Sequence, residues 1–253
     1  MQQPLRFYTG FFVLLSWLLA SCSVYAPLQP GAPVIRQKGE AEVVASAYLN
    51  GRLEASASYS PVEHVIVRAA GGLRAGGGDS TYFRNRQMEL GLGTYRYLNE
   101  QWLVGGLIGY GFGRSNRRFS RDGFETLWLD SVVTYEYAAR YHKLFADAYV
   151  ANDAGRVTYG GAFRLSQVRF TSLTDKGLPL PLQRMTRAEP MLFMRFSGRN
   201  SFRWLQLQLA SSLSWSPDER KHSSSDIRVR DTKEARLFTS FGLVAYPHLF
   251  NEK

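Results

Sequence analysis

The sequence predicts an all-β protein, an antiparallel up-and-down β-barrel of about ten strands that follows a signal peptide and a short extended tether. From Gly39 onward, apolar and polar residues alternate with a period of two, which is typical of strands with two different faces. No segment after the N-terminus keeps a helical period. The connections between the predicted strands alternate between short turns and long polar loops.

The N-terminus has the features of a bacterial export signal. Arg6 precedes the apolar run 11–20, which is shorter than the roughly 20 residues that a membrane-spanning helix needs. The residues Leu19-Ala20-Ser21-Cys22 resemble the lipobox of bacterial lipoproteins, in which the cysteine receives the lipid. We therefore expect residues 1–21 to be a signal peptide and Cys22 to be lipidated. The alternative is a plain secreted protein in which this cysteine is incidental.

Cys22 is the only cysteine of the chain, so disulfides, cysteine-rich zinc sites and thiol catalysis are excluded for the mature body. Residues 22–38 hold three prolines and one glycine, a composition that disfavours both helix and sheet. We expect this segment to be a lipidated, extended tether, and residues 39–253 to form the barrel domain.

Ten segments have the strand pattern. In the clearest one, Leu205, Leu207 and Leu209 point to one side, while Gln206 and Gln208 point to the other. The predicted strands lie near residues 39–49, 52–60, 63–73, 84–98, 101–113, 138–152, 156–170, 188–197, 201–215 and 235–247. The parity of 124–137 disagrees with that of 144–150, which predicts a bulge near Arg140 or a further strand pair.

The lengths of the connections favour a barrel of the outer-membrane type. The short turns are SPVE, LNEQ, DAGR and SGRN, and the long polar segments include SNRRFSRDGFE and PDERKHSSSDIRVRDTKE. Because neighbouring strands are antiparallel, the short turns share one end, as the periplasmic turns of outer-membrane barrels do. An even number of strands then places both termini at this periplasmic end, where a lipid on Cys22 would reach the inner leaflet of the outer membrane.

The leucine face and the charged face decide between two architectures. If the leucines face outward, eight charged side chains face a narrow lumen, where opposite charges pair. These side chains are Glu40, Glu42, Glu54, Arg68, Glu89, Asp147, Arg164 and Arg195. The inverted arrangement describes a soluble, lipocalin-like periplasmic lipoprotein that carries an apolar ligand.

Several motifs resemble those of a known group of proteins. The stretch YAP before the first strand, KGEAEV at its start, SYSPVEHVIVRA, and GLGTYRYL followed by GGLIGYGFG resemble lipoproteins and outer-membrane β-barrel proteins of Bacteroidota-type bacteria. The resemblance covers most of the mature chain and consists of strand and turn patterns. It implies a β-barrel of the cell envelope, and it brings no catalytic residues.

No sequence motif for catalysis, a metal or a cofactor is found. The four histidines are far apart, and no HExxH motif or G-x-S-x-G elbow occurs. The nearest pair for a hydrolase is His142 with Asp147. We therefore expect no enzyme activity, no metal site and no cofactor.

The charge of the chain predicts anionic partners. The formal net charge is +10, and four arginines gather in one predicted loop, at the end where Arg84 and Arg86 begin a strand. Guanidinium groups bind phosphates bidentately, so outer-membrane lipid, through lipopolysaccharide phosphates, is the expected partner; the alternative is a solvated loop. The loop arginines are Arg114, Arg117, Arg118 and Arg121. Nothing predicts nucleic-acid binding, and the expected role is structural, adhesive or binding.

Overall fold

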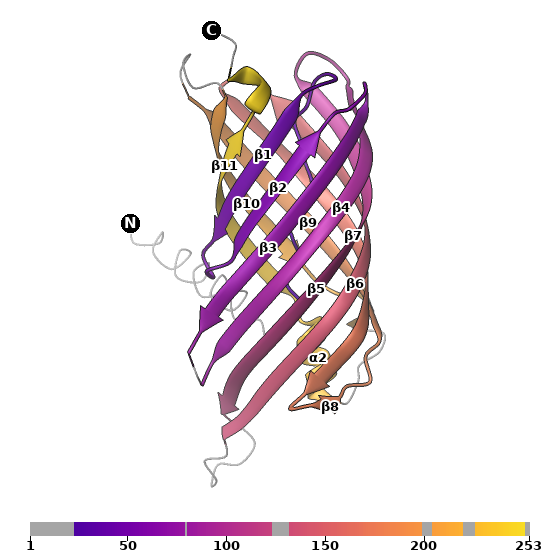
Figure 1. The fold of residues 1–253 in the computed structure, drawn as a ribbon, viewed down its shortest axis with the longest axis vertical. Coiled ribbons are helices and arrows are strands. Elements are labelled where there is room, and N and C mark those ends of the chain that lie inside the picture. Colours follow the sequence, from indigo (N-terminus) through magenta and orange to yellow (C-terminus); the bar gives the residue numbers. More distant parts are fainter. Residues whose placement is uncertain (1–22, 79, 123–131, 199–203, 220–225, 251–253) are drawn as a thin grey trace, which may run out of the picture.

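A computed structural model describes residues 23–78, 80–122, 132–198, 204–219 and 226–250. Within these residues, eleven strands form a single antiparallel sheet (Figure 1). They are β1 (Ala41–Tyr48), β2 (Leu53–Tyr59), β3 (Val65–Gly77), β4 (Tyr82–Tyr97), β5 (Trp102–Asp122), β6 (Val132–Asp153), β7 (Val157–Asp175), β8 (Leu178–Pro179), β9 (Arg184–Ser197), β10 (Leu205–Ser214) and β11 (Arg236–Ala245). The short helices are η2 (Pro217–Glu219), α2 (Ile227–Lys233) and η3 (Pro247–Leu249). No helix in the described ranges has the length and apolar character needed to cross a membrane.

Ten of the strands close into a barrel. Neighbours in the chain pair with one another, β1 pairs with β11, and β7 pairs with both β6 and β9. The two-residue strand β8 adds to the far end of β7 only. The predicted fold class, an antiparallel barrel of ten strands, is confirmed.

Some strands extend further than the alternation predicts. Strand β5 continues through Asp122 and pairs with β6 along its whole length, so most of the segment predicted as a long basic loop is strand. These extensions protrude from the lower end of the barrel in Figure 1, which we call the long-loop end. The opposite end, with turns at 60–64, 98–101 and 154–156, is the short-turn end.

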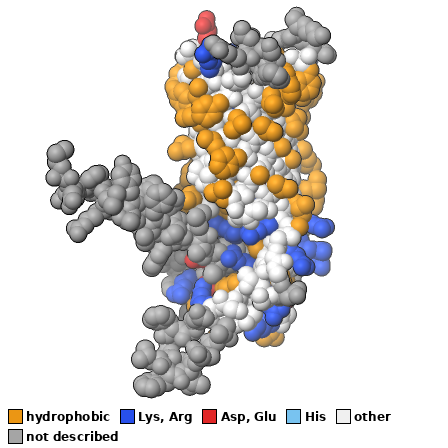
Figure 2. Space-filling model, turned by 90° about the vertical axis from the view of Figure 1, so that its left-hand side faces the viewer, with side chains coloured by type: hydrophobic (Ala, Val, Ile, Leu, Met, Phe, Trp, Pro, Cys, Tyr) orange, Lys and Arg blue, Asp and Glu red, His pale blue; other side chains and the backbone are white. Residues whose placement is uncertain are grey.

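Most of the large aliphatic side chains of the strands point outward. Leu207 and Leu209 on β10 are 50% and 38% exposed, whereas Gln208 and Ala210 between and beside them are buried. Figure 2 shows the outward apolar side chains as an orange band across the face drawn. The alternative of a barrel with an apolar cavity is therefore wrong.

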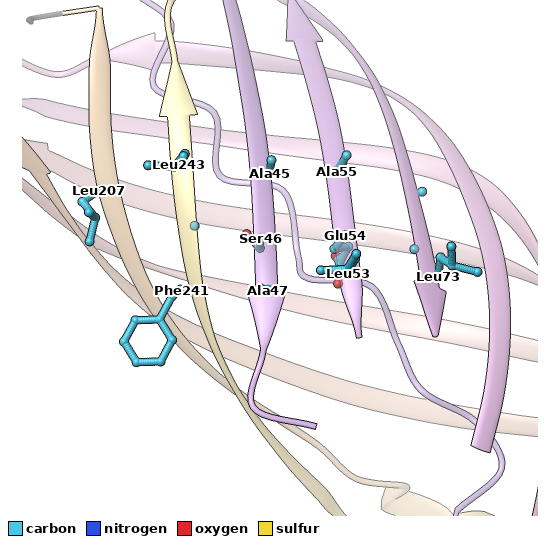
Figure 3. A pocket seen from close by; sticks show the side chains of 13 residues that line it. Ala45, Ser46, Ala47, Leu53, Glu54, Ala55, Leu73, Leu207, Phe241 and Leu243 are labelled. Atoms are coloured by element: carbon cyan, nitrogen blue, oxygen red, sulfur yellow. The ribbon is translucent and has the colours of Figure 1, made fainter. Parts of the chain in front are cut away.

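Small residues thin the apolar band over β1 and β2. Ala45, Ala47 and Ala55 lie there between larger neighbours, including Phe241 of β11 and Leu73 of β3, and they leave a shallow groove of about 680 Å³ (Figure 3). The alanines of these two strands therefore make this the thinnest part of the apolar band. Its side walls are leucine and phenylalanine, as in the rest of the band.

The alternation of β6 is uninterrupted because the irregularity lies on its neighbour. The register of β6 and β7 shifts between Arg140 and Tyr141, so that Thr171 of β7 is the extra residue. The hydroxyl of Thr171 donates to the carbonyl oxygen of Arg140 over 3.1 Å. A bulge near Arg140 was one of the two predicted outcomes, and it is found on the partner strand.

The inward glycines of β5 make room for aromatic rings from β6. A Cβ atom on Gly105, Gly109 or Gly113 would come within 2.6 Å of the ring of Tyr149, Phe145 or Tyr141 respectively. The glycines of β5 therefore leave space in the interior for large side chains of β6.

Candidate functional site

The interior of the barrel contains the chain's own N-terminal segment. Residues 23–35, which we call the lumen segment, are all buried, and Figure 3 shows this part of the chain as a thin trace behind β1 and β2. The prolines were expected to give an extended tether outside the barrel. These residues lie inside it instead, because partners from the barrel wall satisfy their backbone.

The wall binds the lumen segment through its main chain. Seven of its carbonyl oxygens accept hydrogen bonds from inward side chains, and the amides of Gln29, Gly31 and Val34 donate to carboxylates. The carbonyl partners are Arg117 and Arg236 at Ser23, Ser115 at Val24, Gln87 at Ala26, Arg52 at Pro27, Arg164 at Leu28, Arg68 at Gln29 and Arg195 at Ala32. Prolines suit this environment because they bring no amide that must find a partner.

A charged network at the middle of the lumen carries the strongest contacts. Arg164 binds Asp147 through two nitrogens, at 2.6 and 2.8 Å, and Glu89 at 3.0 Å. Glu89 also pairs with Lys143 and lies 3.7 Å from Arg68. All five side chains are nearly fully buried, so each charge is stabilised by its neighbours rather than by bulk water.

Two further ion pairs hold the lumen segment on either side. Arg195 binds Glu42 at 2.7 and 3.1 Å, and the same carboxylate accepts the amide of Val34 at 2.8 Å. Arg52 lies 3.0 Å from Glu54. Of the eight charged residues predicted to face inward, Glu42, Glu54, Arg68, Glu89, Asp147, Arg164 and Arg195 are buried, and Glu40 lies half-buried at the rim.

Some further inward charges were not predicted, although they follow the same alternation. Lys143 has the parity of Asp147 on β6, and Arg187 and Glu189 have the parity of Arg195 on β9. Arg187 donates to the carbonyl oxygens of Lys233 and Ser214, over 2.8 and 2.9 Å. This contact fastens the loop before β11 across the mouth of the barrel.

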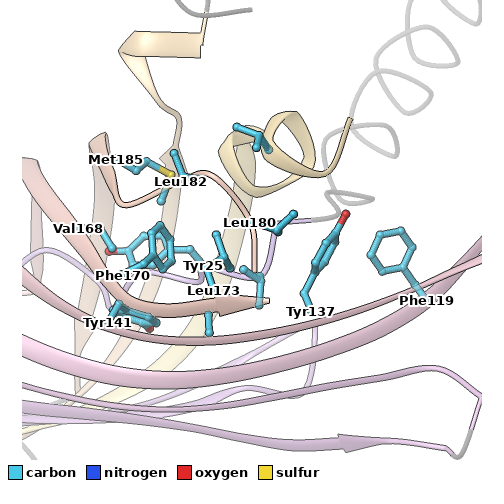
Figure 4. Close-up of a cluster of buried hydrophobic side chains, with 13 residues drawn as sticks. Tyr25, Phe119, Tyr137, Tyr141, Val168, Phe170, Leu173, Leu180, Leu182 and Met185 are labelled. Carbon is cyan, nitrogen blue, oxygen red and sulfur yellow. The ribbon is translucent and has the colours of Figure 1, made fainter. Parts of the chain in front are cut away.

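An apolar cluster closes the long-loop end around Tyr25. Tyr25 of the lumen segment packs edge-on against Tyr141 (Figure 4). The same cluster contains Leu180 and Leu182, and Val229 from α2. The hydroxyl of Ser23 donates to the carbonyl oxygen of Thr232 over 2.8 Å. The short helix α2 therefore lies over the point where the lumen segment begins.

The cap of α2 gives a pH-dependent prediction. Asp226 accepts the backbone amide of Arg228 and both ends of its guanidinium, and these hydrogen bonds lower the pKa of the carboxyl below its ordinary value of about 3.9. A depressed folded-state pKa stabilises the helix above about pH 4, and this contribution is lost as the pH falls through the folded value. The protection factors of the α2 amides against hydrogen exchange should therefore fall below pH 4. Asp226→Asn should remove this pH dependence.

The lumen segment separates the two ends of the described chain. Ser23 lies at the long-loop end beside α2, whereas Arg36 binds Asp153 at 2.6 Å and the carbonyl oxygen of Glu100 at the short-turn end. The last described residues also lie at the short-turn end, where the backbone amide of Ala41 donates to Nδ1 of His248. The expectation that both termini share the short-turn end is corrected by this path through the lumen.

The structure divides the predicted basic loop into two sets. Arg114 and Arg118 point outward from β5, whereas Arg117 and Arg121 point inward. Arg117 donates to the carbonyl oxygen of Ser23 over 2.9 Å, and Arg121 lies 3.2 Å from Asp231. The four arginines therefore do not form one site, because the segment is a strand whose alternate residues face opposite sides.

The outward arginines form a larger set, which we call the arginine belt. Its members occupy five consecutive strands of the wall at the end of the apolar band nearest the long loops, and none of them forms an ion pair with a carboxylate of the described residues. They are Arg84, Arg86, Arg114, Arg118, Arg140, Arg169 and Arg184. Figure 2 shows blue side chains at the lower border of the orange band on the face drawn.

The hydrolase pair considered from the sequence does not assemble. His142 faces outward and stacks on Tyr110, whereas Asp147 faces the lumen and binds Arg164. In the described part of the chain, no group of three or more histidine, cysteine, aspartate or glutamate side chains could hold a metal. Cys22, the predicted lipidation site, lies outside the described residues.

Comparisons with known proteins find similarity in fold. No protein-family model and no curated protein sequence matches the chain. The outer membrane protease OmpT from Escherichia coli matches with a TM-score of 0.47 and 8% identity, over 82% of this chain and 93% of its own. The translocator domain of the autotransporter NalP from Neisseria meningitidis gives 0.41 and 11%, over 81% and 86%. The toluene transporter TbuX from Ralstonia pickettii gives 0.37 and 10%, over 85% and 75%.

These similarities correct one expectation from the sequence. The absence of catalytic motifs led us to expect no enzyme, but one protein with a similar barrel is a protease. The expectation of no enzyme is therefore withdrawn, and at 8% identity the likeness assigns no activity to this chain. The resemblance to Bacteroidota-type envelope proteins stays a prediction.

Proposed function

We propose that this protein is a lipid-anchored outer-membrane barrel, closed by its own N-terminal segment, that presents its long-loop end at the cell surface in a structural, adhesive or binding role. The observation that supports this most directly is the inversion of polarity across the wall. Most large aliphatic side chains face outward, and the inside holds paired charges, buried rings and the lumen segment. A wall of this kind suits a lipid environment.

The path of the lumen segment changes where the lipid would lie. In outer-membrane barrels the short turns face the periplasm and the longer loops face the outside. Ser23 is at the long-loop end, and Cys22 precedes it directly in the sequence. A lipid on Cys22 would then lie in the outer leaflet, and not in the inner leaflet as the sequence alone suggested.

Protease access on intact cells tests this orientation. A protease recognition sequence inserted between Cys22 and Ser23 should be cut by external protease, which separates the radiolabelled palmitate from the barrel. The same sequence inserted at the exposed turn residue Gly155, at the short-turn end, should be cut only after the outer membrane is permeabilised. Carbonate-resistant membrane association serves as the control for insertion.

The opposite pattern would reject the orientation. Cleavage at Gly155 and protection after Cys22 would mean that the lipid lies on the periplasmic side. Release of the whole protein by carbonate once the lipid is cut away would reject the membrane barrel itself. The absence of palmitate on a protein that contains Cys22 would reject the anchor alone.

A further inference from the structure

Three members of the arginine belt are direct neighbours on the outer face. Arg86 of β4 pairs in register with Arg114 of β5, which pairs with Arg140 of β6. Directly opposite residues of antiparallel strands have Cβ atoms about 4.5–5.5 Å apart, and like charges there destabilise the sheet. All three side chains are exposed, and among the described carboxylates none forms an ion pair with them. These three neighbouring guanidinium groups therefore form a cationic surface that can bind an anion.

A groove with both polar and apolar walls continues this row. It has a volume of about 980 Å³ and lies at the bulge of β7, where Ser172 is the register partner of Arg140. Arg169 and Arg184, which pair in register, provide its positive side. Its apolar walls are Leu144, Leu180, Leu182 and Pro179. The groove thus offers contacts to a ligand that is charged at one end and apolar at the other.

The position of the site on the barrel identifies the ligand as a lipid. Along β5, the outward residues change from Tyr110 and Phe112 to Arg114, and along β4 they change from Leu90 and Met88 to Arg86. The arginines therefore begin where the apolar band ends. In a membrane, this is the depth at which hydrocarbon gives way to headgroups.

We propose that this surface, formed by Arg86, Arg114, Arg140, Arg169 and Arg184, binds a lipid with a multiply phosphorylated headgroup. Guanidinium groups hold the phosphates through paired hydrogen bonds, and an acyl chain lies along Leu144 and the apolar walls of the groove. The proposal rests on the proposed function, because only an inserted barrel brings this border to a headgroup layer. The belt is on the same side as the long loops, so the lipid belongs to the outer leaflet.

The binding test uses the purified full-length protein in a neutral detergent, titrated with bisphosphorylated lipid A and followed by native mass spectrometry. The triple substitution Arg86→Gln, Arg114→Gln and Arg140→Gln should weaken binding at least about tenfold, the loss expected for one charge-assisted contact. A matched control, Lys38→Gln with Arg96→Gln and Arg156→Gln, removes three exposed charges at the short-turn end and should bind as the natural chain does. Lipid A without its phosphates should bind weakly to all three proteins.

Several results would overturn the proposal. Equal affinities of the triple variant and the natural chain would reject the site, and equal weakening in the control would show attraction by net charge alone. Inorganic pyrophosphate that binds as tightly as lipid A would reject a lipid ligand. Faster migration of each unboiled variant on a gel verifies that it is folded. Because binding is measured in detergent, a wrong orientation in the cell would leave this result unchanged.

Discussion

Replacing Arg164 by methionine is expected to destabilise the barrel by about 3–5 kcal/mol, the usual cost of removing one partner from a buried ion pair. Its guanidinium is fully buried and binds Asp147, Glu89 and the carbonyl oxygen of Leu28. Without it, Asp147 keeps the amide of Gly31 as its hydrogen-bond donor. The measurement is the urea dependence of unfolding, followed by the gel migration of unboiled protein.

A surface arginine next to the same strand supplies the control. Arg156→Met, in the exposed turn before β7, should change the free energy of unfolding by no more than about 0.5 kcal/mol. Adding Asp147→Leu to Arg164→Met should recover part of the loss, because the uncompensated carboxylate is then also removed. If Arg164→Met were as mild as Arg156→Met, water rather than the guanidinium would be compensating Asp147.

Most predictions about the fold depend on the alternation of apolar and polar residues along the strands. It places Leu207 and Leu209 outside and Gln208 inside, and the structure confirms this for the charged positions as well. The reason is geometric, since successive side chains of a strand must point to opposite faces. The same rule applies to Lys143 of β6 and Arg187 of β9, which also face the lumen.

The prediction for the basic segment was wrong because the strand was ended too early. The prediction places the residues after Gly113 in a loop, where side-chain orientation does not follow an alternation. Strand β5 continues to Asp122, and the alternation then sends Arg114 outward and Arg117 inward. Long polar strands beyond the apolar band look like loops by composition, because no lipid or core selects apolar residues for them.

The path of residues 23–35 could not be predicted from the sequence. Prolines at 27, 30 and 33 indicate an extended chain. The same composition suits an extended chain in water and one in a polar lumen, so it does not distinguish the two locations. Its partners are distant in sequence: Gly31 donates to Asp147, 116 residues away. A network of inward charges predicts that the lumen is filled, but it does not say by which part of the chain.

Deleting residues 24–35 should convert the closed barrel into a conducting pore. The deletion removes the segment that fills the lumen and leaves its former donors, including Arg52, Arg68 and Arg195, facing the space. A barrel of about eight strands is just filled by its own side chains, so ten strands leave room that the segment occupies. In planar bilayers, the natural chain should carry no steady current, and the deletion variant should show discrete current steps.

Two controls connect this current to the lumen segment. A synthetic peptide of residues 23–36, added to the side of the long loops, should block the current of the deletion variant, because the carbonyl and amide partners in the wall are unchanged. In cells, the deletion joins Ser23 directly to Arg36 at the short-turn end, so a protease site after Cys22 should become protected. A folded deletion variant that carries no current would mean that inward arginines and carboxylates close the lumen without the segment. Current through the natural chain would mean that the segment leaves the lumen in the membrane.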